Sequence, residues 1–150
     1  MSADDTVPVW FKEHIALYRT DPEKAHFWDS AVAGRTDGVI RTLLLTTTDA
    51  SMGNEIYSPL IYGEDGVSCV VVASKGGAPG HPPWYLNLVK DPHCEVQVGL
   101  RHFKAVARTT EGAEREPFWA MMNTIYPHYA DFQQRAGGGE LPVVLLEPEA

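Results

Sequence analysis

The segment Ala73-Ser74-Lys75-Gly76-Gly77 places a hydroxyl, a cation and two glycines directly after an apolar, β-branched run. Glycines let the backbone approach a ligand closely and turn its N–H groups toward that ligand. A lysine adds a point charge that suits a phosphate or a carboxylate. The segment therefore indicates a loop that binds an anionic ligand, with an ordinary polar turn as the alternative because short glycine motifs recur by chance.

Two further segments carry aromatic side chains that a ligand could contact. A pair of prolines that begins at Pro82 stiffens the approach to a short helix, and Trp84 offers a flat wall for an aromatic ring. Tyr126, Tyr129 and Phe132 are spaced three residues apart, so a helix would align them on one side. Packing in the core is the alternative for all of them, but tyrosine hydroxyls could also donate a proton or orient a carbonyl.

Composition excludes several classes of function. The net charge of −8 argues against binding to nucleic acid and to anionic membrane surfaces, because both need clustered Lys and Arg. No histidine pairs with a carboxylate or thiol at metal-ligand spacing, so no metal site is predicted. Cys69 and Cys94 lie in strand-like runs and are expected in the core. The polar N-terminus and the lack of a long apolar run predict a cytoplasmic protein without a membrane segment.

The first forty residues are predicted to form N-terminal helices. Trp10, His14 and Tyr18 recur at helical spacing, and Asp21 before Pro22 is typical of a helix start. We expect the second helix to run through residues 27 and 28.

The remainder, residues 41–150, alternates short strands and helices within what we expect to be a single domain of 150 residues. Helices are predicted around Trp84, after Thr110 with Pro117 as a candidate start, and through Phe132. Strands are predicted at residues 42–48, 56–62, 67–74, 95–98, 103–108 and 141–146. Because hairpins join most of these strands, the pattern predicts an α+β fold, with about six mainly antiparallel strands in a closed or partly closed barrel.

Many of these strings, in this order, resemble the deazaflavin-dependent nitroreductase family. The resemblance extends from about Leu43 to Pro148 and covers over two thirds of the chain. It is carried by Leu43-Leu44-Leu45-Thr46-Thr47-Thr48, Pro59-Leu60-Ile61-Tyr62, Val72-Ala73-Ser74-Lys75-Gly76-Gly77, Trp84-Tyr85-Leu86-Asn87-Leu88, Asp91-Pro92, Val96-Gln97-Val98-Gly99, Ile125-Tyr126-Pro127-His128-Tyr129-Ala130-Asp131 and Pro142-Val143-Val144.

The resemblance implies a split β-barrel that binds the reduced deazaflavin coenzyme F420 and passes its hydride to quinones, enones or nitroaromatic-like acceptors. It implies that Tyr126 and Tyr129 lie beside the substrate and that Ser74 takes part in the chemistry. It also implies a small hydrophobic or aromatic substrate, and it allows a homodimer. The residues expected to face the cofactor are Ala73, Ser74, Lys75, Gly76, Gly77, Pro82 and Trp84.

The chain departs from the family after the threonine-rich strand. Relatives carry Gly-Arg-Lys-Ser/Thr-Gly and a further Arg there, which hold the phosphate and the acidic tail of the cofactor. Here Ala50, Ser51 and Ile56 replace the basic positions, and Asp49 and Glu55 add negative charge. The cations left to hold the tail are Lys75, Arg35 and Arg41.

These residues support an F420-dependent oxidoreductase as the main hypothesis. The lost basic positions favour an alternative, a cofactor-independent isomerase, cyclase or lyase that uses the former deazaflavin pocket for a hydrophobic substrate. A ligand-binding protein without catalysis is a third hypothesis.

Overall fold

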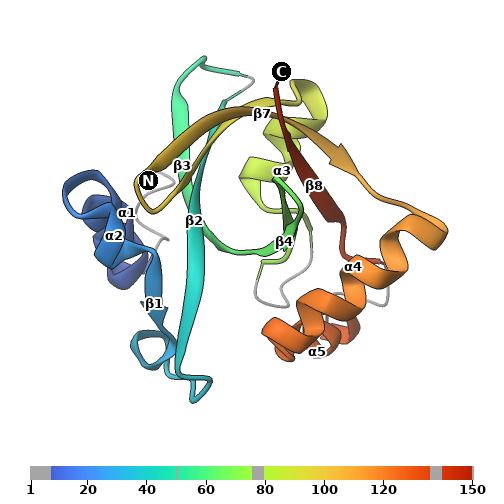
Figure 1. Cartoon of the computed structure of the whole chain (residues 1–150), viewed down its shortest axis with the longest axis horizontal. Coiled ribbons are helices and arrows are strands. Elements are labelled where there is room, and N and C mark those ends of the chain that lie inside the picture. The colour runs from blue at the N-terminus through green and yellow to red at the C-terminus, as the bar shows by residue number, and fades with distance from the viewer. Residues whose placement is uncertain (1–7, 50, 76–79, 136–139, 150) are drawn as a thin grey trace.

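The computed structural model describes residues 8–49, 51–75, 80–135 and 140–149, which form a curled sheet with helices at its margins (Figure 1). The strands are β1 (Phe27–Asp29), β2 (Val39–Thr48), β3 (Glu55–Ile61), β4 (Gly63–Asp65), β5 (Ser68–Val72), β6 (His93–Val98), β7 (Arg101–Thr109) and β8 (Val143–Pro148). The helices are α1 (Val9–Thr20), α2 (Pro22–Ala25), the short 3-10 helix η2 (Ser30–Ala33), α3 (Pro83–Lys90), α4 (Gly112–Ile125) and α5 (His128–Arg135).

The strands follow the order β1-β2-β6-β7-β8-β5-β4, and β3 also pairs with β2. All of these pairings are antiparallel. The ribbon bends through most of a circle (Figure 1), as antiparallel strands with strong twist do. The predicted α+β barrel architecture is confirmed, with eight strands in place of about six.

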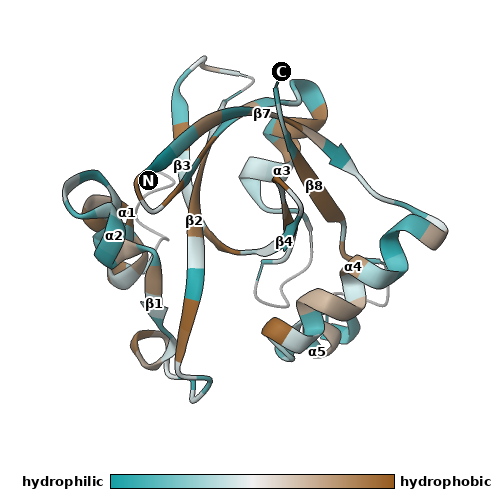
Figure 2. Ribbon diagram, viewed as in Figure 1, coloured by the Kyte–Doolittle hydropathy of each residue, from teal (hydrophilic) through white to brown (hydrophobic). Residues whose placement is uncertain are grey.

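The barrel interior is filled from alternate positions of the strands, as the two-residue period of a strand requires. Leu43 and Leu45 of β2 face Val71 of β5 in this interior cluster, which also buries both cysteines as predicted. Figure 2 shows the hydrophobic colouring concentrated along β2 and β8. The other face of β5 carries Val70 and Val72, which pack in a second cluster under α4 and α5.

One prediction about local structure is wrong. Phe27 and Trp28 form strand β1, because they pair with Arg41 and Ile40 of β2. At these two residues tertiary packing outweighs local preference, since most helix and strand stability comes from the buried face. Helix α4 begins at Gly112, as expected for a helix that starts after Thr110, and the alternative start at Pro117 is not used, because the proline lies inside the helix.

The N-terminal helices are tied to β2 by buried polar groups. The Tyr18 hydroxyl donates to the Thr42 carbonyl at 2.5 Å, and His14 Nε2 lies 2.8 Å from the Ala25 carbonyl. Because that carbonyl only accepts, Nε2 carries the proton. Burial lowers the pKa of His14 below its ordinary value, an effect only partly offset by the bond to Ala25.

None of the helices in the described ranges is long and apolar enough to cross a membrane.

We expect His14 to make the fold less stable in mild acid. The unfolded chain takes up a proton on this histidine as the pH falls below about 6.5, while the folded chain resists it. The free energy of unfolding should therefore decrease with falling pH, by at most roughly 1.4 kcal/mol per pH unit from this group. Denaturant titrations between neutral pH and mild acid should show a shallower dependence for His14→Gln than for the wild type. A dependence equal to the wild type's would contradict this role.

Candidate cofactor and substrate site

The predicted site residues lie on both faces of β5 and at its end. Ala73 and Trp84 belong to the barrel-interior cluster. Tyr126 and Tyr129 belong to the second cluster, which contains Val72 of β5. Val72 ends β5 and is the last residue before Ala73. The chain therefore enters the predicted loop directly from a strand residue that packs in the tyrosine cluster.

The loop itself begins from a fixed backbone. The Ala73 N–H donates to the Pro142 carbonyl at 2.8 Å, and the Ser74 N–H donates to the Val72 carbonyl at 3.1 Å. Ser74 is half-buried and Lys75 is exposed. Gly76 and Gly77 lie outside the described residues. Lys75 is thus available to a charged ligand, whereas Ala73 can contribute only backbone.

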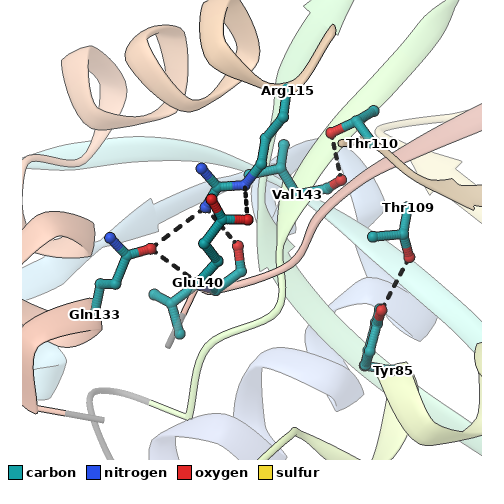
Figure 3. Close-up of polar contacts among 8 residues, drawn as sticks. Tyr85, Thr109, Thr110, Arg115, Gln133, Glu140 and Val143 are labelled. Carbon is teal, nitrogen blue, oxygen red and sulfur yellow. Dashed lines mark hydrogen bonds and ion pairs between the residues drawn. The ribbon is translucent and has the colours of Figure 1, made fainter. Parts of the chain in front are cut away.

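Helix α3 closes one end of the barrel. Pro82 precedes its first turn, and Trp84 is 4% exposed within the interior cluster. The Tyr85 hydroxyl lies 2.9 Å from the Thr109 hydroxyl and ties α3 to β7 (Figure 3). Trp84 therefore packs as a core residue, which is the alternative given for it from the sequence.

Tyr126 and Tyr129 form an edge-to-face pair with ring centroids 5.3 Å apart. The two residues are 5% and 6% exposed. No hydrogen bond links either hydroxyl to another described residue, and neither oxygen is among the fully buried polar atoms without a partner. Burial raises the pKa of both phenols. Because the rings are buried while the hydroxyls make no bond within the described residues, these two groups are suited to donate to a ligand.

Hydrogen bonds around Arg115 connect helices α4 and α5 with the segment before β8 (Figure 3). Buried Arg115 of α4 donates through Nη2 to the Leu141 carbonyl at 2.8 Å and to Gln133 Oε1 at 3.3 Å. The same Gln133 oxygen accepts from the Leu141 N–H at 3.0 Å. Thr110 donates to the Val143 carbonyl at 2.8 Å. These bonds fix α4 and α5 against β8, which sets where the tyrosines lie.

The loop between η2 and β2 completes the cluster, and sequence reasoning missed this. His128 Nε2 lies 2.8 Å from Asp37 Oδ1, and the Arg35 guanidinium lies 5.1 Å from the Phe132 ring centroid. Trp28 packs against the same cluster, and its buried Nε1 has no partner in the part of the chain that the structure describes. The contacts span about ninety residues of sequence, so no local spacing signals them.

The carboxylate of Asp49 accepts hydrogen bonds from other residues of the turn that follows β2. Asp49 Oδ1 accepts from the Ser51 N–H and the Ser51 hydroxyl, both at 2.8 Å, and from the Met52 N–H at 3.4 Å. The Ser51 bonds lower the pKa of Asp49. The turn thus presents a carboxylate in place of a cation, while Ala50 lies outside the described residues.

A cavity of about 160 Å³ lies at Tyr62, Cys69 and Arg101, near the β6–β7 hairpin. It includes none of the predicted site residues. Arg41 lies 4.0 Å from Glu64, which lines this cavity.

The model of a family described as F420H(2)-dependent quinone reductase matches residues 10–148. The chain belongs to the F420H(2)-dependent quinone reductase family. An F420H(2)-dependent quinone reductase of Mycobacterium tuberculosis is 30% identical over 91% of this chain and 95% of its own length. This quinone reductase family member is therefore an oxidoreductase with coenzyme F420 as its cofactor, and the cofactor-independent alternative is not supported.

Solved structures support the assignment of the chain to this family. An F420-H2 dependent reductase has a TM-score of 0.66 at 39% identity, over 71% of this quinone reductase family chain and 93% of the other. A structure described as a domain-swapped dimer has the same TM-score and identity, over 79% of that chain. The split-barrel fold implied by the sequence is confirmed.

The described residues of this quinone reductase family member fit the ring part of a deazaflavin. Unpaired hydroxyls of Tyr126 and Tyr129, an unpaired Trp28 N–H and apolar neighbours are the chemistry that a planar ring with polar edges needs. The acidic turn at Asp49 does not supply the cations for an anionic tail. Lys75 is the exposed cation nearest to the end of β5 in the chain.

Proposed function

We propose that this chain reduces a quinone-type acceptor at the end of β5, with the acceptor between the Ser74–Lys75 segment and the tyrosine pair. The carrying observation is the pair of buried tyrosine rings in one cluster with Val72 of β5, whose hydroxyls make no hydrogen bond to another described residue. When bound, the reduced deazaflavin supplies the hydride.

The protein's own groups then bind the acceptor and orient it. Tyr126 and Tyr129 donate hydrogen bonds to a carbonyl oxygen of the acceptor, and these bonds strengthen as negative charge develops there. Their raised pKa keeps both phenols protonated, as donation requires. The apolar cluster around them excludes water from the reacting atoms. Ser74 and backbone groups of residues 73–77 position the cofactor, together with Pro82 and Trp84.

The proposal also includes the oligomeric state of the protein and its location in the cell. The solved relative described as a domain-swapped dimer supports a homodimer. The acidic composition supports a cytoplasmic enzyme that acts on a small hydrophobic or aromatic molecule and binds no nucleic acid.

The testing experiment is a fluorescence titration of the purified protein with reduced and oxidised F420. A screen of quinones, enones and nitroaromatic compounds as acceptors follows it. Saturable binding with quinone reduction supports the proposal. Absence of binding at high cofactor concentration would refute it.

Lys75→Ala is expected to weaken F420 binding by about 10- to 100-fold, because one charge-assisted hydrogen bond is worth about 1.5–3 kcal/mol. The apparent KM for the quinone should change little. Lys90→Ala, which removes an exposed lysine at the end of α3, is the matched control. Equal F420 affinity in Lys75→Ala and the wild type would exclude Lys75 as an anchor.

A further inference from the structure

Quinone reduction consumes a proton as well as a hydride, so the proposed function requires a proton source. Tyr126 and Tyr129 are poor sources, since burial raises the pKa of each and makes the phenolate costly. A histidine exchanges protons readily near neutral pH. The proton donor is therefore best sought among imidazoles that touch the tyrosine cluster.

His128 is such an imidazole. Its ring centroid lies 4.8 Å from that of Tyr126, and it stacks on Phe132 with an interplanar angle of 24°. Its side chain is 31% exposed. The ring thus contacts the cluster and still reaches solvent, from which a proton donor must be recharged after each turnover.

Asp37, in the loop before β2, contacts this imidazole. Its two carboxylate oxygens lie 2.8 and 2.9 Å from His128 Nε2, and its side chain is 19% exposed. A carboxylate at Nε2 fixes the proton on that nitrogen and orients the ring, as in other aspartate–histidine pairs. Nδ1 has no partner among the described residues and remains for the acceptor.

We propose that His128 donates the proton of quinone reduction through Nδ1 and that Asp37 is its positioning residue. The inference rests on the proposed function. The acceptor gains a hydride, with its electron pair, from the reduced deazaflavin. An O–H bond forms at the acceptor oxygen as the Nδ1–H bond of the imidazolium breaks, and solvent returns the proton to Nδ1. The acceptor is reduced by two electrons and the deazaflavin is oxidised by two.

The groups that face the imidazole are few. Asp37 and Arg35 approach it from the loop before β2, and Tyr126 from the end of α4. Asp37 is the carboxylate at Nε2, whereas Arg35 lies over the stacked Phe132 ring. The pair can therefore be tested by the position of the imidazole proton.

The first test uses the protein without cofactor. NMR of the imidazole nitrogens should find the proton of neutral His128 on Nε2 in the wild type. Asp37→Asn should redistribute the proton between the nitrogens, because the carboxylate that accepts from Nε2 is gone. An unchanged tautomer would overturn the role of Asp37. The control is Glu149→Gln, which breaks the exposed His93–Glu149 pair, whose atoms are 3.1 Å apart.

The second test follows single turnovers of protein loaded with reduced F420 and mixed with a soluble benzoquinone. His128→Gln is expected to slow oxidation of the cofactor by roughly 100-fold, and Asp37→Asn by at least about 10-fold. F420 affinity and thermal stability should stay close to those of the control His93→Gln. The wild-type rate should fall as rising pH removes the imidazolium proton, and His128→Gln should lack this fall.

A rate within about threefold of the wild type for His128→Gln, or a retained fall with pH, would overturn the proposal. Failure of the proposed function is distinguishable, because the wild type itself would then neither bind F420 nor reduce the quinone. In that case the donor role fails with it, while the NMR result still decides whether Asp37 orients His128.

Discussion

A double variant with Ser51→Lys and Ile56→Arg is expected to bind F420 more tightly than the wild type by about two to four powers of ten. Each restored cation can make a charge-assisted hydrogen bond worth about 1.5–3 kcal/mol, so two contribute roughly 3–6 kcal/mol. Ser51 is exposed in the turn, and Ile56 is half-buried on β3 opposite Thr47. An arginine stem can follow the strand while its head reaches water.

Fluorescence titration at low and moderate salt measures this gain. The increase should shrink as salt is added, because exposed charges are screened. A variant with Ser51→Gln and Ile56→Gln controls for side-chain length without charge and should gain little. Equal affinities for the Lys/Arg variant and the wild type would show that the tail of the cofactor lies elsewhere, at Lys75 or Arg35.

Tyr126→Phe should lower the rate of quinone reduction by about 100- to 1,000-fold, the usual effect of removing one donor that acts on developing negative charge. The change deletes a hydroxyl without a protein partner among the described residues and keeps the ring in its contacts with Tyr129 and His128. The fold should therefore retain its stability, and F420 affinity should change little.

Single-turnover rates and thermal unfolding of the same sample separate the two roles of this residue. Phe132→Leu serves as the comparison, since it disturbs the same aromatic cluster without removing a donor. If Tyr126→Phe unfolds at a much lower temperature than the wild type, the hydroxyl is structural. If it turns over at the wild-type rate, the tyrosine is only packing.

The sequence by itself determined the fold class and the family. Apolar runs joined by hairpin turns predict antiparallel strands because side chains alternate across a sheet, and β2, β5, β6 and β7 lie close to their predicted positions. Ordered strings such as Ala73–Gly77 and Ile125–Asp131 identified the cofactor class. The strand positions follow from local spacing of side-chain types, whereas the family and the cofactor class follow from the resemblance of these strings to the deazaflavin-dependent nitroreductase family.

Tertiary structure decided what depends on distant parts of the chain. Trp28 belongs to a strand because it pairs with Ile40 of β2, although its neighbours suggest a helix. Trp84 turned out to be a core residue, since α3 inserts it into the barrel. Asp37 meets His128 only because the loop before β2 folds back on α5. Long-range contacts of this kind have no sequence period, because they are fixed by how the sheet curls and which faces the helices bury.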